Sequence, residues 1–225
     1  MDIDTVTKKD SHEKILNEFK NNNIDILIGT QMIVKGHHFP NVTLVGVIAA
    51  DSSLNIDDYR ANERTFQILT QVAGRAGRGE IPGKVIIQTY NPDSFSIQCA
   101  KRQNYKIFYD TEIVLRKQLK YPPFCDIIVI GFSSIDEKEI IDTSHKVYEF
   151  LKINIDKLQN EKIKLFKPMP APIDKIQNRF RYRIIIKAKM TEDINIILNQ
   201  CLKNIYQKNL KSTRISIDVN PNNMS

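Results

Sequence analysis

Residues 44–51, Leu-Val-Gly-Val-Ile-Ala-Ala-Asp, place a carboxylate directly after a short apolar run. An unbroken apolar run of this length is typical of a strand buried on both faces, and such strands belong to parallel sheets covered by helices. In open sheets of this kind, ligands collect at the carboxyl ends of the strands. Asp51 therefore marks the end of a predicted strand and a candidate binding position.

The same pattern recurs on both sides of this strand. Apolar runs at residues 24–28 and 84–90 predict two more strands, and both are bounded by turn-forming residues. Amphipathic helices are predicted over residues 11–22 and from about Tyr59 onward. Because apolar strands alternate with helices, the first part of the chain is predicted to be α/β with a parallel sheet.

The second part of the chain has a different order of elements. A stiff joint, Tyr121-Pro122-Pro123-Phe124, precedes a βαββαβ pattern, which is typical of a ferredoxin-like or ribosomal-protein-like α+β domain. We predict a first domain over 1–92, a helical connector over 93–123 and a C-terminal domain over 124–225. The elements of the C-terminal pattern are strand 125–134, helix 137–158, strand 163–176 interrupted by prolines, strand 180–189, helix 191–209 and strand 213–219.

Composition is that of an ordinary globular protein with a basic second part. The 225 residues are 41% hydrophobic and 26% charged, with a formal net charge of +7. Residues 1–92 carry 10 Lys and Arg against 11 Asp and Glu, whereas residues 93–225 carry 23 against 15. Such a basic domain is typical of nucleic-acid binding, although a solvated lysine-rich surface gives the same count.

Targeting and cysteine signals are weak. No apolar run reaches 18 residues and the N-terminal residues do not resemble a signal peptide, so we expect a cytoplasmic protein without a membrane span. The three cysteines, Cys99, Cys125 and Cys201, are far apart in sequence. Their spacing indicates neither a zinc site nor a disulfide framework.

Two arginines stand close together in the stretch Gln71-Val72-Ala73-Gly74-Arg75-Ala76-Gly77-Arg78. Arg75 and Arg78 are three residues apart, so they share one face of the predicted helix, and each guanidinium suits phosphate oxygens. Each follows a glycine, and a glycine within a helix costs about 1 kcal/mol relative to alanine. The pair is a candidate phosphate grip, although frayed helix ends and solvated turns carry the same residues.

A second candidate follows the first predicted strand, where Thr30 and Gln31 precede Lys35-Gly36-His37-His38. A hydroxyl, an amide, a lysine and backbone N–H groups are suited to a phosphodiester chain, and an ordinary capped turn is the alternative. Adjacent histidines point apart, and no cysteine or carboxylate cluster lies beside them. We therefore predict no metal site in this chain.

The third candidate is Arg179-Phe180-Arg181-Tyr182-Arg183. Strand alternation places Arg179, Arg181 and Arg183 on one face and the two aromatic rings on the other. An exposed row of arginines suits phosphate contact, whereas a solvated strand face over an aromatic core is the plain alternative.

Taken together, the motifs resemble the second motor lobe of the PriA family of replication-restart helicases, also called primosomal protein N′, within helicase superfamily two. The Gly29-Thr30-Gln31 segment looks like motif V and the Gln71–Arg78 segment looks like motif VI. The resemblance is most specific in residues 24–92 and extends more loosely over the whole chain. The segments that carry it are Ile26–Pro40, Asp51, Tyr59–Arg64 and Gln71–Arg78.

This resemblance implies a role for each candidate residue. ATP with Mg²⁺ binds between two RecA-like lobes in this family, so Arg75 and Arg78 would stabilise the γ-phosphate and Gln71 would position the nucleotide or its attacking water. The positions implied nearer the nucleotide are Gly36, Asp51, Gly74 and Gly77. The positions implied for DNA contact are Thr30, Gln31, Lys35, His37, Arg179, Arg181 and Arg183.

The family resemblance also implies partners and a context. It implies a bacterial 3′→5′ DNA helicase of stalled or branched forks, active in the cytoplasm at the nucleoid, with the single-stranded-DNA-binding protein and primosome proteins as partners. The zinc-binding cysteine clusters of the family have no counterpart in this sequence. The sequence also contains no Walker motif, Gly-x-x-x-x-Gly-Lys-Ser/Thr, and no Asp-Glu box. We therefore expect a C-terminal part of a larger helicase that does not hydrolyse ATP alone.

Two alternatives remain open. One is a different superfamily-two translocase, acting on RNA or on reversed forks. The other is a non-enzymatic nucleic-acid-binding module based on the βαββαβ part, although the aromatic motif of an RNA-recognition domain is not present in the sequence.

Overall fold

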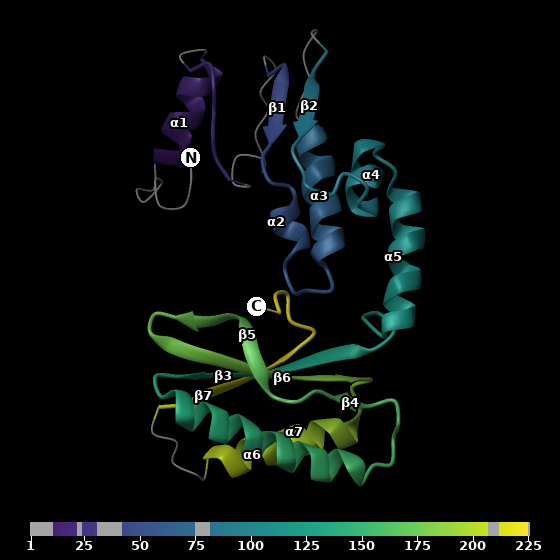
Figure 1. Cartoon of the computed structure of the whole chain (residues 1–225), viewed down its shortest axis with the longest axis vertical. Helices are drawn as coiled ribbons and strands as arrows, with labels where there is room; N and C mark the ends of the chain where they lie inside the picture. The colour runs from purple at the N-terminus through teal and green to yellow at the C-terminus, as the bar shows by residue number, and fades with distance from the viewer. Residues whose placement is uncertain (1–10, 22–23, 31–41, 75–81, 207–211, 225) are drawn as a thin grey trace. The chain divides into compact units, whose positions relative to one another are not determined.

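The computed structural model describes residues 11–21, 24–30, 42–74, 82–206 and 212–224, shown in Figure 1. They divide into two compact units. The first unit runs to Asn55 and continues over Arg60–Tyr109, whereas the second comprises Ile56–Tyr59 and the chain from Asp110 onward. The sequence-based boundaries at residues 92 and 123 remain predictions.

The first unit contains a small parallel sheet with helices packed on it. Strands β1 and β2 pair in parallel, with Leu44 opposite Lys84 and Val47 opposite Ile87. The elements are α1 (Ser11–Lys20), β1 (Leu44–Val47), α2 (Asp51–Leu54), α3 (Ala61–Ala73), β2 (Lys84–Ile87) and α4 (Phe95–Lys101), and α5 (Tyr105–Leu119) begins in this unit. The predicted α/β arrangement with parallel strands is therefore present.

The core of the first unit lies along helix α3. Its buried residues, among them Phe66 and Leu69, recur at helical spacing and so form one face. The rings of Phe66 and Phe108 stack with centroids 4.3 Å apart, and Phe95 stacks on Phe108 at 5.5 Å. This aromatic stack joins α3 to α4 and to the first turn of α5, and it fixes the helix that leads to the arginine pair.

One predicted strand of the first unit is wrong. Residues 24–30 form no strand, and Ile26 and Ile28 are each 75% exposed. An apolar strand is stable where both of its faces are covered and a neighbouring strand pairs with its backbone. The described residues supply neither to this segment. Strand β1 is also shorter than predicted, because Ala49 has a positive φ of 53° and ends the extended run.

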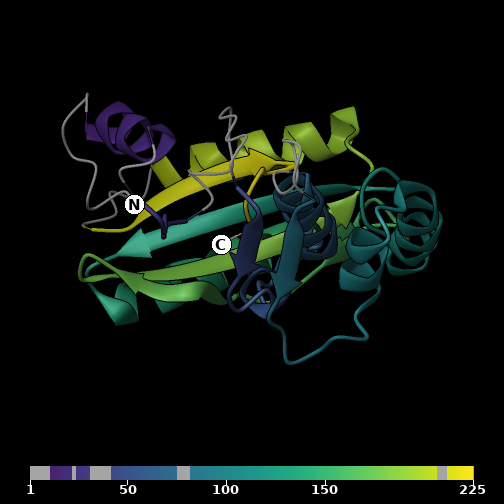
Figure 2. The same ribbon diagram turned by 90° about the horizontal axis from the view of Figure 1, so that it is seen from above.

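The second unit is a five-stranded antiparallel sheet with two helices. The strands lie in the order β4-β6-β3-β7, and β5 pairs with β6. Figure 2 shows β7 in yellow beside β3 in teal. The elements are β3 (Asp126–Ser134), α6 (Glu137–Asp156), β4 (Lys164–Leu165), β5 (Met169–Ile176), β6 (Arg179–Ala188), α7 (Glu192–Tyr206) and β7 (Arg214–Val219).

Local signals account for the element boundaries in this unit. Asp136 caps α6, because its carboxylate accepts hydrogen bonds from the backbone N–H groups of Lys138 and Glu139. The two residues between β5 and β6, Gln177 and Asn178, both have positive φ, which is the geometry of a tight hairpin turn. The strand predicted over 163–176, with an interruption by prolines, is divided into β4 and β5, and prolines lie near the break.

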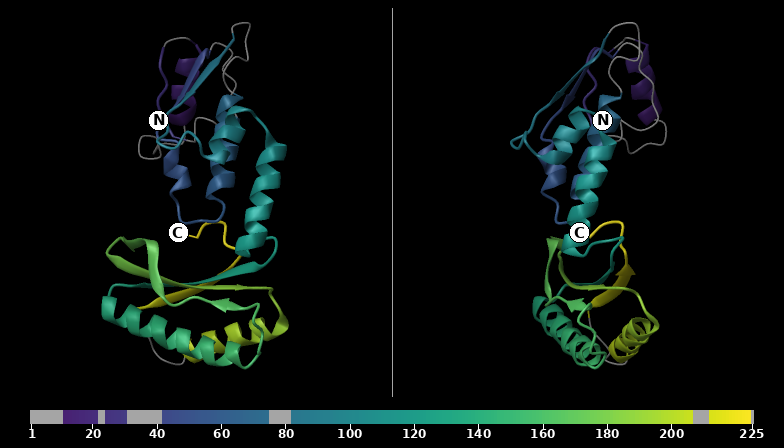
Figure 3. Two further views of the ribbon diagram at one scale, coloured as in Figure 1. Left: turned by 45° about the vertical axis from the view of Figure 1, so that its right-hand side comes forward. Right: turned by 90° about the vertical axis from the view of Figure 1, so that its right-hand side faces the viewer.

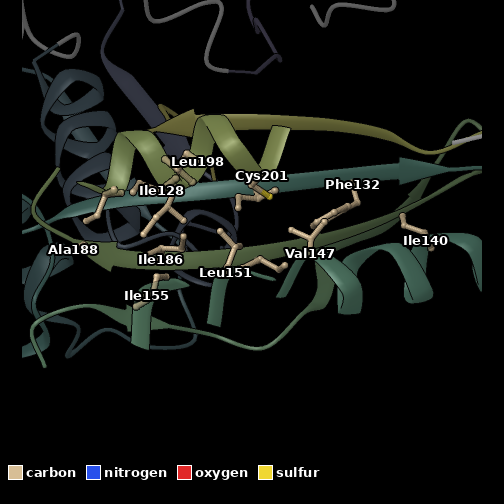
Figure 4. Close-up of a cluster of buried hydrophobic side chains, with 14 residues drawn as sticks. Ile128, Phe132, Ile140, Val147, Leu151, Ile155, Ile186, Ala188, Leu198 and Cys201 are labelled. Atoms are coloured by element: carbon tan, nitrogen blue, oxygen red, sulfur yellow. The ribbon is translucent and has the colours of Figure 1, made fainter. Parts of the chain in front are cut away.

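The main core of the second unit lies between the sheet and its helices. Helices α6 and α7 cover the same face of the sheet, as both views of Figure 3 show. The even-numbered residues of β3 and β6, such as Ile128 and Ile186, pack there against Leu151 of α6 and Leu198 of α7 (Figure 4). The odd-numbered residues of these strands therefore line the opposite face, which we call the open face.

The C-terminal residues fold back over part of the open face. Asn220 has a φ of 52°, and its side-chain amide accepts from the N–H of Ile127 at 3.0 Å and donates to Asp126 at 2.9 Å. This turn directs the yellow tail of Figure 1 to the side of the sheet opposite α6 and α7. Met224 packs there against Ile127 and Ile185.

Candidate functional site

Asp51 joins the carboxyl ends of the two parallel strands. It begins α2, and its carboxylate accepts from Thr89 Oγ1 at 2.7 Å, from the N–H of Tyr90 at 2.8 Å and from the N–H of Asn91 at 3.3 Å. The Tyr90 and Thr89 hydrogen bonds lower the pKa of Asp51 from its usual 3.8. Both carboxylate oxygens are thus engaged by donors of this chain, which is a structural role that sequence reasoning did not foresee.

The predicted motif VI residues are described only in part. Gln71 lies exposed in the last turn of α3, and the N–H of Gly74 donates to the carbonyl of Thr70 at 3.1 Å where the helix ends. Gly74 has a φ of −71°, which any residue adopts, so its backbone conformation alone does not require glycine. Arg75, Gly77 and Arg78 lie outside the described residues.

The predicted motif V residues are described still less. Thr30 is exposed and follows the segment that forms no strand. The other four positions, Gln31, Lys35, Gly36 and His37, lie outside the described residues. The expected nucleotide and DNA contacts of the first unit therefore remain predictions.

The three arginines of β6 share the open face, but they are not an exposed row. Arg179 donates to the carbonyls of Ser133 at 3.0 Å and Ser212 at 2.8 Å, and also to Ser133 Oγ. Arg181 makes one long hydrogen bond, 3.4 Å, to the carbonyl of Ile173. The bonds of Arg179 hold this outer arginine against β3 and against the residues that precede β7.

Arg183 is buried, although the sequence predicted an exposed row of arginines. Its residue is 4% exposed, and it forms an ion pair with Asp57 and donates to the carbonyl of Met224 at 2.5 Å. The guanidinium is buried because the C-terminal tail and the segment Ile56–Tyr59 pack over it. A buried cation needs such partners, since an unpaired one would be strongly destabilising.

Strand register brings two further residues to the arginines. Ser133 of β3 is opposite Arg181 on one side and Arg214 of β7 on the other. In the next row, Gly131 lies between Arg183 and Ser216. Sequence reasoning missed Arg214 and Ser216 as site residues, because the alternation in residues 213–219 shows which side chains share a face but not which strand lies beside them.

No metal centre is formed by the described residues. Groups of three or more His, Cys, Asp or Glu side chains that would hold an ion do not occur among them. All three cysteines are buried, and burial raises the pKa of the Cys201 thiol to about 11, which disfavours the thiolate that a metal requires. A zinc ion of the kind implied by the resemblance therefore does not fit this part of the chain.

None of the described helices is both long and apolar enough to cross a membrane.

Two family models match this chain, one in its first part and one in its second. Residues 2–80 match the helicase conserved C-terminal domain, and residues 117–222 match the primosomal protein N C-terminal domain. The two matches follow each other in the order expected from the sequence.

Relatives of known name match nearly the whole chain. Replication restart protein PriA of Bacillus subtilis is 44% identical over 223 residues, and that of Synechocystis is 40% identical over 220 residues. Each match covers 98% of this chain. The matched part is only 27% of the Bacillus subtilis protein and 26% of the Synechocystis protein. Among solved structures, the de novo designed protein Foldit4 matches 43% of this chain at 11% identity with a TM-score of 0.34, which carries no argument about the fold.

Proposed function

This chain is homologous over almost its whole length to a C-terminal part of the PriA replication restart proteins, and we propose that it serves as that part of an ATP-dependent DNA helicase. The observation that carries the proposal is the 44% identity to Bacillus subtilis PriA over 98% of the chain, together with the helicase domain match at residues 2–80. The proposed reaction is 3′→5′ unwinding of stalled or branched forks, which prepares primosome assembly for replication restart.

In this proposal the first unit supplies one side of an ATP site between two RecA-like lobes. Arg75 and Arg78 would contact the γ-phosphate, and an arginine in such a position contributes about 10³-fold or more to phosphoryl transfer. Gln71 would act beside them. ATP with Mg²⁺ supplies the free energy for movement along DNA, and the proposed surroundings of the nucleotide are Gly36, Asp51, Gly74 and Gly77.

For Asp51 we propose a structural role in this site, whereas the sequence suggested a position near the nucleotide. Its oxygens accept hydrogen bonds from Thr89, Tyr90 and Asn91, so we propose that it holds the strand ends beside the nucleotide rather than binding the nucleotide itself. The order of the elements supports this placement, because Asp51 begins α2, the next element after β1, and binding sites form at the carboxyl ends of parallel strands.

DNA contact is proposed for both units. In the first unit the proposed residues are Thr30, Gln31, Lys35 and His37. In the second unit the proposed residues are Arg179, Arg181 and Arg183, with Arg181 the most available of the three because its one hydrogen bond is long. Further proposed partners are the single-stranded-DNA-binding protein and other primosome proteins, in the bacterial cytoplasm at the nucleoid.

We also propose the ferredoxin-like class for the second unit. The supporting observations are the strand order β4-β6-β3-β7, the antiparallel pairing of every neighbour in it, and the two helices on one face. This sheet carries a helix-covered face for the core and an open face for binding, which is how antiparallel sheets commonly divide their two sides.

Two assays test the proposed function. Because the sequence holds no Walker motif, the purified 225-residue chain should show no ATP hydrolysis stimulated by forked DNA; stimulated hydrolysis that disappears in Arg78→Ala would overturn this part. A longer protein that contains this chain and a Walker motif should unwind forked DNA. Faster unwinding of duplex RNA would favour the alternative of an RNA translocase.

A further inference from the structure

A pocket of about 300 Å³ lies on the open face of the five-stranded sheet. It lies within the second unit, over the middle of strands β6, β3 and β7 and beside the C-terminal tail. The lining residues that matter here are Gly131, Arg181, Arg183, Arg214, Ser216 and Asn223. Three arginines in so small a pocket indicate an anionic ligand.

Gly131 keeps the floor of the pocket empty. It lies between Arg183 and Ser216 in the strand register. A Cβ atom added to Gly131 would lie 2.9 Å from Ser216 Oγ, which is closer than such atoms approach in proteins. A side chain at position 131 would therefore displace the Ser216 hydroxyl and fill the floor, so the glycine is needed for the shape of the pocket.

Two arginines flank the next row of the sheet. Arg181 and Arg214 lie on either side of Ser133, so their Cα atoms are about 10 Å apart, which is two strand spacings. Two arginine side chains at this separation can contact a small anionic ligand from both sides. Arg214 is exposed. Among the described residues, Arg214 forms no ion pair and Arg181 makes only its long hydrogen bond to the carbonyl of Ile173.

The remaining charges leave the pocket positive. Arg183 is paired with Asp57, and its Nε atom is buried without a hydrogen-bond partner among the described residues. Asp218 also lines the pocket, but it lies two rows along β7 from Arg214, beside Val129. The charges of Arg181 and Arg214 are therefore not neutralised at the Ser133 row.

We propose that this pocket binds a phosphate group and, resting on the proposed DNA function, that the phosphate belongs to a nucleic-acid backbone. Arg181 and Arg214 contact its oxygens from two sides, since a guanidinium presents a planar fork of donors to phosphate. The Ser216 hydroxyl donates from the floor. Backbone contact of this kind positions a nucleic acid without selecting its base sequence.

The first test removes one arginine. Arg214→Ala in the 225-residue chain should weaken binding of forked DNA about tenfold, because it removes a charge-assisted hydrogen bond. The slope of the logarithm of the affinity against the logarithm of the salt concentration should become shallower by about one, because one phosphate contact is lost. Lys152→Ala, an exposed position on α6 across the sheet, is the matched control and should leave both quantities unchanged. Fluorescence anisotropy at several salt concentrations measures them.

The second test fills the floor without changing charge. Gly131→Ala should weaken forked-DNA binding to a similar degree, whereas Gly46→Ala should not, because a Cβ at Gly46 meets nothing within 4 Å. Both glycines lie in strands, so the pair controls for the effect of alanine on a strand. Circular dichroism confirms that each variant is folded.

The third test separates backbone phosphate from free phosphate. Addition of inorganic phosphate to the same chain should shift the amide NMR signals of Gly131 and Ser216, and Arg214→Ala should abolish the shifts. Shifts with an unchanged DNA affinity in Arg214→Ala would overturn the nucleic-acid part and leave a free-phosphate site. Shifts without any DNA binding by the chain would count against the proposed function but not the pocket. If Arg214→Ala and Gly131→Ala both leave the DNA affinity unchanged, and phosphate causes no NMR shifts, the pocket does not bind phosphate. The proposed DNA function would still stand.

Discussion

Arg183 and Asp57 form an ion pair between a buried guanidinium and an exposed carboxylate, since the side chain of Arg183 is 5% exposed and that of Asp57 is 77% exposed. Residues 56–59 belong to the second unit although their neighbours in sequence, α2 and α3, belong to the first. The pair and the bond from Arg183 to Met224 hold three distant segments together.

Asp57→Ala should destabilise the second unit, because it leaves a buried cation with a single backbone acceptor. We expect a loss of roughly 1–2 kcal/mol in the free energy of unfolding, between the values for exposed pairs and for fully buried pairs. Native-state hydrogen exchange of β3 and β6 amides measures it. Asp142→Ala, exposed on α6, is the control. Equal protection in both variants would contradict a stabilising role for the pair.

Acid should weaken the turn at Asn220. Hydrogen bonds from the Asn220 side chain and from the N–H of Met190 lower the pKa of Asp126 from its usual 3.8. A lowered pKa in the folded chain means that the stabilisation is complete above the unfolded-state value and is lost as the pH falls through the folded-state value.

Asp126→Asn should therefore be less stable than the unsubstituted chain at neutral pH, and the difference should shrink as the pH falls below about 3.8. Urea denaturation of both chains, measured at pH values from neutral down to about 2, checks this prediction, because carboxyl groups titrate within this range. A difference that stays constant over this range would show that the charge of Asp126 contributes nothing.

Asp51→Ala should loosen the carboxyl ends of the parallel strands. The amide protons of Tyr90 and Asn91, which donate to Asp51, should exchange faster with solvent, while the amides of α4 should be unaffected. Hydrogen exchange measured by NMR tests this. Unchanged exchange at Tyr90 would indicate that the carboxylate is free for another partner.

Helical periodicity and apolar runs predicted most of the elements, because these signals are local. The face of α3 that carries Phe66 and Leu69 is one example, and the cap at Asp136 is another. The exposed run at Ile26 and Ile28 shows the limit, because an apolar run becomes a strand only when other segments cover and pair with it.

The candidate site depended on contacts between segments far apart in sequence, so less of it was predictable. Alternation correctly placed Arg181 and Arg183 on one face, but nothing in residues 179–183 indicates that Asp57, more than a hundred residues earlier in the chain, buries Arg183. Arg214 became a site residue only through its register opposite Ser133.

The central claim is that this chain supplies the arginines of a shared ATP site. The most direct measurement uses a chimera in which this chain replaces the matching segment of Bacillus subtilis PriA, to which it is 44% identical. We predict DNA-stimulated ATP hydrolysis by the chimera and a loss of about a thousandfold in Arg75→Ala and in Arg78→Ala, with binding of forked DNA retained. Arg102→Ala, exposed in the first unit, should keep the full rate. Undiminished hydrolysis in both Arg75→Ala and Arg78→Ala would contradict the claim.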